Sequence, residues 1–150
     1  MTGLPPLWSN VGVRCGRILA LDYGTKNIGL ASCDELGITV HPLPSLPNTD
    51  RRYLLRRIEE AVKDHDIESL VIGLPLNMDG TSGEAVRKVR AFAEFLQTEL
   101  HLPLGEVDER LSTVEALEMW TTMGARQQRK YRTVDSLAAA LILQRYLEES

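Results

Sequence analysis

The chain has 150 residues, of which 43% are hydrophobic and 25% are charged, and its formal net charge is −4 at pH 7. This length suits one domain with a sizeable core, and the composition is that of a soluble globular protein. The acidic balance excludes a protein that is basic over its whole surface, although a local basic patch can still contact phosphate. No apolar stretch reaches the length of a membrane span, and no secretory signal pattern is present, so we expect a cytoplasmic protein.

The N-terminal segment differs from the rest of the chain. Residues 1–16 contain Pro, Gly and Ser with little periodicity, so we expect a flexible N-terminal tail followed by one domain over residues 17–150. The two cysteines, Cys15 and Cys33, have no metal-site spacing. We expect Cys33 to be a buried thiol.

The first strand of the domain is predicted by a short apolar run over residues 18–21, which ends on Asp22. Gly24 and Gly29 are expected to punctuate a tight turn, and a second strand begins at Ile28. This places a carboxylate at the carboxyl end of a central strand, the edge at which open α/β sheets carry their sites. The alternative is that Asp22 only starts a hairpin turn, where Asp before Gly is common.

The remaining elements are predicted by apolar periodicity and turn residues. The third strand contains Pro42 and Pro44, which suit the edge of a sheet. Residues 125–133 are expected to form a basic loop. The other predictions are a third strand over 38–43, a helix after Asp50, a strand over 69–73, a helix over 82–100, a strand over 104–107, and helices over 112–123 and 134–147. This order predicts a mixed α/β sheet flanked by helices.

Three acids stand where this topology could bring them together. Asp22 ends the first strand, Glu109 (or Asp108) ends the last one, and Asp135 lies in the first turn of the last helix. Converging carboxylates without a basic partner need a counter-charge, which Mg²⁺ or Mn²⁺ can supply. Two such ions about 4 Å apart promote phosphodiester cleavage. The pattern therefore indicates a metal-dependent phosphoryl-transfer site.

Each of these features also has a purely structural interpretation. Asp135 could simply favour the dipole of its helix, and Glu109 could pair with Arg110 on the surface. The pair Asp79-Gly80 could be only a turn. The basic run over 126–132 could be a solvated segment.

Three blocks of the sequence together resemble the YqgF/RuvX family of bacteria, whose members are regarded as Holliday junction resolvases or pre-16S rRNA nucleases. The blocks are residues 22–31, residues 71–80, and residues 107–113 followed by 134–143, and the resemblance spans about residues 17–147. The resemblance implies a ribonuclease H-like fold, with a mixed five-stranded sheet flanked by helices, and a divalent-metal-dependent nuclease.

The resemblance also assigns roles to residues. Asp22, Glu109 and Asp135 match the family's catalytic acids, which would bind Mg²⁺ or Mn²⁺. Two positions depart from the pattern: Asn27 stands where the family often has Arg, and Arg132 stands where more distant junction-resolving relatives have a further acid. The substrate-binding residues that the resemblance suggests are Gly24, Thr25, Lys26, Asn77, Asp79, Arg110, Arg126, Arg129 and Lys130.

The expected partner is nucleic acid rather than a membrane. The first functional hypothesis is cleavage of structured RNA in the 5′-end maturation of pre-16S rRNA. A second is resolution of four-way DNA junctions, which would require a homodimer because two symmetric cuts need two related sites. A third is a nucleic-acid-binding factor without catalysis. The sequence leaves open whether the protein is a monomer or a homodimer.

Overall fold

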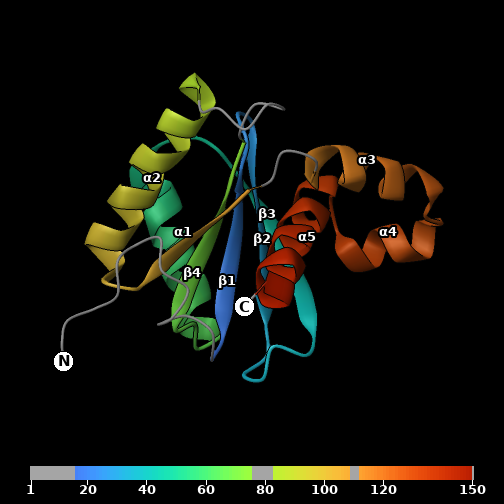
Figure 1. Cartoon of the computed structure of the whole chain (residues 1–150), viewed down its shortest axis with the longest axis horizontal. Helices are drawn as coiled ribbons and strands as arrows, with labels where there is room; N and C mark the ends of the chain where they lie inside the picture. Colours follow the sequence, from blue (N-terminus) through green and yellow to red (C-terminus); the bar gives the residue numbers. More distant parts are fainter. Residues whose placement is uncertain (1–15, 76–82, 109–111, 150) are drawn as a thin grey trace.

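The computed structural model describes residues 16–75, 83–108 and 112–149. These residues form one five-stranded sheet of order β3-β2-β1-β4-β5 with helices on both faces (Figure 1). The strands are β1 (Ile18–Tyr23), β2 (Asn27–Cys33), β3 (Val40–Pro47), β4 (Ser69–Leu74) and β5 (Leu104–Asp108). The helices are α1 (Arg51–Asp64), α2 (Glu84–Leu100), α3 (Ser112–Thr122), α4 (Ala125–Tyr131) and α5 (Val134–Glu149).

The sheet is mixed, as the sequence predicted. β1, β2 and β3 pair antiparallel, whereas β4 runs parallel to β1, and β5 runs parallel to β4. The parallel strands β1, β4 and β5 therefore end at the same edge of the sheet. α1 and α2 cover one face, and α5 covers the other, with α3 and α4 beyond it (Figure 1). Within the described ranges, no helix is long and apolar enough to cross a membrane.

The third strand lies at the edge of the sheet, as its prolines predicted, but it begins later than expected. Residues 38 and 39 belong instead to the β2–β3 turn, where the Asp34 carboxylate accepts hydrogen bonds from the backbone N–H groups of Ile38 (2.9 Å) and Thr39 (3.1 Å). Asp34 is thus the residue that ends β2 and shapes the turn.

The prediction of a loop over residues 125–133 is wrong, because residues 125–131 form the helix α4. The segment consists mainly of good helix formers. Two contacts fix it: the Gln128 side chain donates to the carbonyl of Trp120 (2.8 Å), and Tyr131 packs against a small cluster that includes Leu137 and Ala138 of α5. Tertiary packing therefore completes a helix that lacks an apolar stripe of its own.

Each face of the sheet has its own core. Leu19 and Leu21 of β1 pack with residues of α1 and α2, whereas Ile18 and Ala20 pack with residues of α5. Cys33 is a buried thiol, as expected, and burial raises its pKa. Residues 1–15 of the expected N-terminal tail lie outside the described residues.

Candidate nucleic-acid cleavage site

Asp22 lies on the face of the sheet that α5 covers. Side chains alternate along a strand, so Asp22 shares a face with Ile18 and Ala20, which pack against α5. In the antiparallel β1–β2 ladder, Asp22 stands directly opposite Gly29. The carboxylate is thus presented near the carboxyl end of β1, toward the helix that carries Asp135.

Gly29 lets the start of α5 approach the sheet. A Cβ atom at this position would overlap the carbonyl group of Asp135 and lie 3.1 Å from the backbone nitrogen of Ser136. Gly29 lies inside β2, in the second strand expected from Ile28 rather than in the turn before it. It is needed there for space, and the close approach places the backbone of Asp135 against the β2 residue that stands opposite Asp22.

Two hydroxyl groups fix the first turn of α5. The Thr133 hydroxyl oxygen accepts a hydrogen bond from the backbone N–H of Ser136 (3.0 Å) and thereby caps the helix. The fully buried Ser136 hydroxyl donates to the carbonyl of Leu43 in β3. Near this point the β2–β3 register shifts between Ile28 and Leu30, and such irregularities free backbone groups from the ladder. The residues on both sides of Asp135 in the sequence are therefore fixed by hydrogen bonds.

The two acids occupy a partly dehydrated environment. Asp22 is only 9% exposed, and Asp135 is half-buried. Burial raises the pKa of the Asp135 carboxyl, because removal from water disfavours the charged form. Carboxylate oxygens are the ligands that Mg²⁺ and Mn²⁺ prefer. Asp22 and Asp135 thus fit a divalent cation, although the described residues contain no group of three potential metal ligands.

The β1–β2 turn follows Asp22 and contains Gly24, Thr25 and Lys26. Asn48 holds this turn in place. Its side chain donates to the carbonyl of Gly24 (2.8 Å), and its backbone N–H donates to the carbonyl of Lys26 (2.8 Å). Thr25 and Lys26 are exposed. A turn held by two hydrogen bonds, with the exposed side chain of Lys26, therefore lies directly after one of the acids.

At the end of β5, Arg145 of α5 joins three elements. One guanidinium nitrogen donates to the carbonyl of Asp108 (2.7 Å), and another pairs with the Glu115 carboxylate in α3 (3.0 Å). Glu109, the expected third acid, follows Asp108 directly in the sequence. Four expected site residues, Asn77, Asp79, Glu109 and Arg110, lie outside the described residues.

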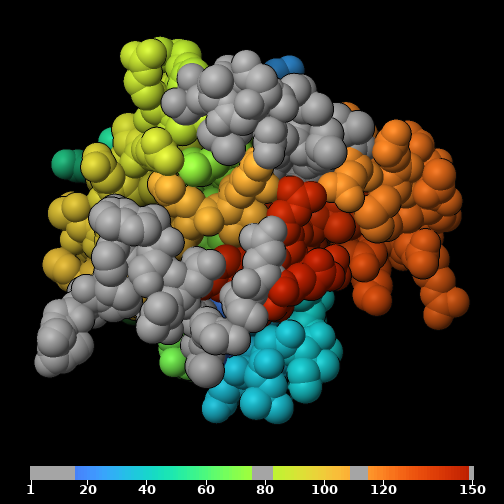
Figure 2. All heavy atoms as spheres, in the orientation of Figure 1, coloured from blue at the N-terminus to red at the C-terminus, as the bar shows by residue number. Residues whose placement is uncertain are grey.

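The cations Arg126, Arg129 and Lys130 lie on α4, which leads directly into the N-terminal turn of α5. All three belong to a helix with no buried residue, and no acid accompanies them in it. In the space-filling view, α3 and α4 (orange) form a lobe at one side of the molecule (Figure 2). This arrangement offers a basic surface beside the segment that carries Asp135.

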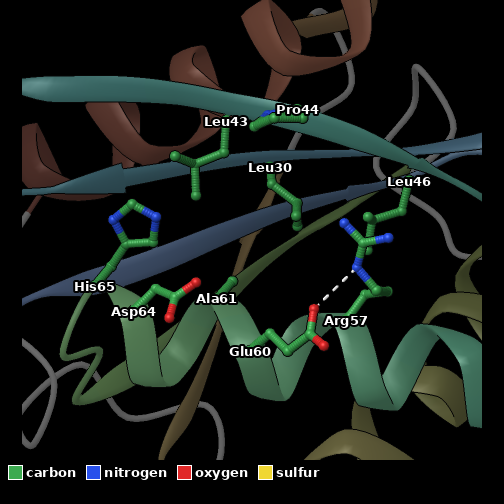
Figure 3. A pocket seen from close by; sticks show the side chains of 9 residues that line it. All are labelled: Leu30, Leu43, Pro44, Leu46, Arg57, Glu60, Ala61, Asp64 and His65. Atoms are coloured by element: carbon green, nitrogen blue, oxygen red, sulfur yellow. Dashed lines mark ion pairs between the residues drawn. The ribbon is translucent and has the colours of Figure 1, made fainter.

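A separate hollow lies on the opposite face of the sheet. Leu30, Leu43 and Leu46 line its floor, and α1 contributes polar side chains, among them the ion pair of Arg57 with Glu60 (3.1 Å; Figure 3). None of the described site residues predicted from the sequence lines this hollow.

The order and directions of the strands, with α5 packed on one face of the sheet, are those of a ribonuclease H-like domain. The chain belongs to the RuvX family, because the family model, described as Holliday junction resolvase, matches residues 16–149. The family predicted from the three sequence blocks is thereby confirmed.

Relatives and solved structures agree with this assignment. A protein of Syntrophus aciditrophicus is 44% identical over 132 residues, with 88% of both chains covered, and one of Lachnospira eligens is 40% identical over 135 residues, with 88% of this chain and 96% of the relative covered. Both are named as candidate pre-16S rRNA nucleases.

Among solved structures, T. thermophilus RuvC in complex with a Holliday junction has a TM-score of 0.54 at 11% identity and covers 89% of this chain and 95% of its own. The fowlpox virus resolvase with its junction DNA has a TM-score of 0.55 at 12% identity, and the match covers 89% of this chain and 97% of the resolvase chain. At this identity, the likeness shows the fold, and it confirms the ribonuclease H-like class predicted from the sequence.

Sequence reasoning missed four residues around the site. The space that Gly29 provides and the hydrogen bonds from Asn48 to the β1–β2 turn both involve residues far apart in the sequence. Ser136 and Arg145 carried no signal of their own, because each acts through a backbone carbonyl far away in the sequence. A Thr-x-x-Ser pattern at residues 133–136 is the one local clue that could have marked the cap of α5.

Proposed function

We propose that this chain is a divalent-metal-dependent endonuclease that cleaves phosphodiester bonds in structured RNA, in the 5′-end maturation of pre-16S rRNA. The observation that carries the proposal is that Asp22 stands opposite Gly29, the residue against which the backbone of Asp135 packs. The names of relatives at 40–44% identity support RNA as the substrate. Processing of ribosomal RNA also fits a cytoplasmic protein.

In this proposal, Asp22 and Asp135 hold Mg²⁺ or Mn²⁺ through their carboxylate oxygens, with Glu109 as the third ligand. The bound metal would supply the positive charge that activates water and stabilises the leaving oxygen. Val107 packs on the α5 face, so strand alternation places Asp108, the last residue of β5, on the other face of the sheet.

The protein's other residues bind and orient the substrate. Cleavage forms a bond between a water oxygen and phosphorus and breaks the bond from phosphorus to the leaving oxygen, which takes up a proton. Gly24, Thr25 and Lys26 contact the substrate backbone next to Asp22, and Arg126, Arg129 and Lys130 bind phosphates along α4. Asn77, Asp79 and Arg110 remain proposed substrate-binding residues.

A second candidate substrate is a four-way DNA junction. The family description and the fold shared with junction-bound resolvases favour it. Resolution by paired cuts predicts a homodimer, whereas RNA trimming requires only a monomer. The oligomeric state of the active species therefore helps to separate the two substrates.

The test is a cleavage assay with purified protein in Mg²⁺ and in Mn²⁺. The substrates are an RNA that carries a 16S precursor 5′ extension and a mobile four-way DNA junction. Asp22→Asn controls for contaminating nuclease, and Glu118→Gln, a change to an exposed acid on α3, is the matched control that should retain activity. Cleavage of the RNA that Asp22→Asn abolishes would support the proposal, and symmetric nicking of the junction would favour the second candidate. Binding without cleavage of either substrate would contradict a nuclease.

A further inference from the structure

A strained turn joins α4 to α5, and Arg132 is its central residue. Arg132 has φ 71° and ψ −64°, and the N–H of Thr133 donates to the carbonyl of Tyr131 at 2.8 Å. This geometry is a γ-turn with positive φ, which is rare for residues that have a Cβ atom. Glycine would adopt it without steric conflict. The protein thus places a large side chain where the backbone favours none.

The conformation of Arg132 differs from an ordinary left-handed helix end. His101, at the C-terminus of α2, also has positive φ, with φ 56° and ψ 37°. Those values lie near the centre of the left-handed region, which commonly ends helices. Arg132 has a negative ψ and lies outside that region. The strain is therefore not explained by the ending of α4 alone.

Among the described residues, no ion pair explains the position of the Arg132 charge. The side chain is exposed, and none of the ion pairs found between described residues includes it. Thr133, the next residue, caps α5 and leads to Asp135 two residues later. Arg132 is thus the last cation of the α4 series and the one nearest in sequence to the acid.

We propose that Arg132 binds a backbone phosphate of the nucleic-acid substrate beside the acid site, and that the strained turn is retained because it holds this cation there. The inference rests on the proposed function, which supplies the nucleic acid. A guanidinium group forms paired, charge-assisted hydrogen bonds with phosphate oxygens, and it stays protonated under all conditions of the reaction. Arg132 would continue the phosphate path from α4 to Asp135.

The experiment separates the side chain from the backbone. Arg132→Gln removes the charge and keeps the Cβ atom, Arg132→Lys keeps the charge, and Arg132→Gly removes both the charge and the strain. His101→Gly is the matched backbone control. Binding to the precursor RNA is measured as a function of salt in the Asp22→Asn background, and Tm is measured for every variant.

We expect Arg132→Gln and Arg132→Gly to weaken binding several-fold and to reduce the slope of log K against log[salt] by about 0.7 to 0.9, the value for one phosphate contact. Arg132→Lys should keep the slope. Arg132→Gly should have a Tm no lower than that of the parent, because the relief of strain offsets the greater freedom of its unfolded chain. His101→Gly should leave binding unchanged.

If Arg132→Gln binds with the same affinity and salt slope as the parent, the proposed phosphate contact is wrong. If Arg132→Gly has a Tm several degrees lower than the parent, the proposed strain at residue 132 is wrong. Cleavage by the otherwise unmodified chain is measured in parallel. If that chain binds RNA but does not cut it, the nuclease proposal fails while the test of Arg132 stands. If it binds neither RNA nor the junction, both proposals fail.

Discussion

Gly29 and Asp135 are in direct backbone contact: a single methyl group on Gly29 would overlap the Asp135 carbonyl. Gly29 also stands opposite Asp22 in the β1–β2 ladder, so one position on β2 neighbours the backbone of both acids. The distance between β2 and α5 is therefore a property of the candidate site as well as of the core.

Gly29→Ala should destabilise the fold and reduce cleavage, because α5 must move away from the sheet. Overpacking of this kind typically costs about 1–3 kcal/mol of unfolding free energy. Chemical denaturation and the cleavage assay measure the two effects. Gly124→Ala is the control, since a Cβ atom there meets nothing within 4 Å. Equal losses in the two variants would contradict a specific role for Gly29.

Asp135→Asn should lose cleavage without losing stability at neutral pH. Burial raises the pKa of the Asp135 carboxyl in the folded protein, so its ionisation opposes folding as pH rises through that pKa. Removing the charge removes this penalty, while cleavage should fall about 100-fold or more, or about 2.7 kcal/mol in the barrier. In addition, Mn²⁺ should raise the Tm of the parent by more than that of the variant. A marked loss of stability in Asp135→Asn would show instead that Asp135 is structural.

Ser136→Ala tests the anchor of α5 on β3. The change leaves the Leu43 carbonyl without its buried donor, which should cost about 1–3 kcal/mol of unfolding free energy. Thr121→Ala is the matched control, because the Thr121 hydroxyl makes a comparable bond to a carbonyl within the exposed helix α3. Hydrogen exchange should show faster opening of the first turn of α5 in Ser136→Ala only. Identical exchange in both variants would argue against the anchor.

Arg145→Met should reduce cleavage more than it reduces stability. The substitution removes the hydrogen bond that fixes the end of β5, directly before Glu109, and we expect a cost of about 1 kcal/mol of unfolding free energy. Glu115→Gln weakens only the exposed ion pair, which is worth about 0–1 kcal/mol. Urea denaturation and cleavage rates at saturating Mn²⁺ separate the effects. The role in positioning would be excluded by normal cleavage in Arg145→Met.

Asp34 makes the stability of the β2–β3 turn depend on pH. Its hydrogen bond from the Thr39 hydroxyl, followed by that from the Ile38 N–H, lowers the pKa of the carboxyl to about 2. A lowered pKa means that the stabilisation is present at neutral pH and is lost as pH falls through about 4 toward 2. The Tm difference between the parent and Asp34→Ala should therefore be constant near neutral pH and shrink in acid. A difference that does not change with pH would contradict this origin.

The strands and most helices could be predicted because their signals are local. Apolar runs predicted β1 and β4, and the prolines of β3 predicted an edge strand. Asp50 predicted the start of α1, where its carboxylate accepts a hydrogen bond from the backbone N–H of Tyr53 and caps the helix. Asp22 and Asp135 could be proposed as site acids because each stands at the end of such an element, and their roles stay predictions.

The features that the sequence did not predict depend on contacts between distant parts of the chain. Gly29 appears in the sequence as a turn residue, and only the position of Asp135 shows that it provides space. The helix α4 depends on the packing of Tyr131 against α5, which no periodicity within α4 reveals. The backbone conformation of Arg132 likewise depends on how α4 and α5 meet, and an arginine side chain does not predict a positive φ.

The late position of α5 in the sequence has a consequence for synthesis. α5 follows every strand, covers one whole face of the sheet and also carries Asp135. A nascent chain that lacks it exposes the apolar side chains of that face and also lacks Asp135. The packing of α5 is therefore also the step that brings Asp135 to β2, so the proposed site stays incomplete until this helix has left the ribosome.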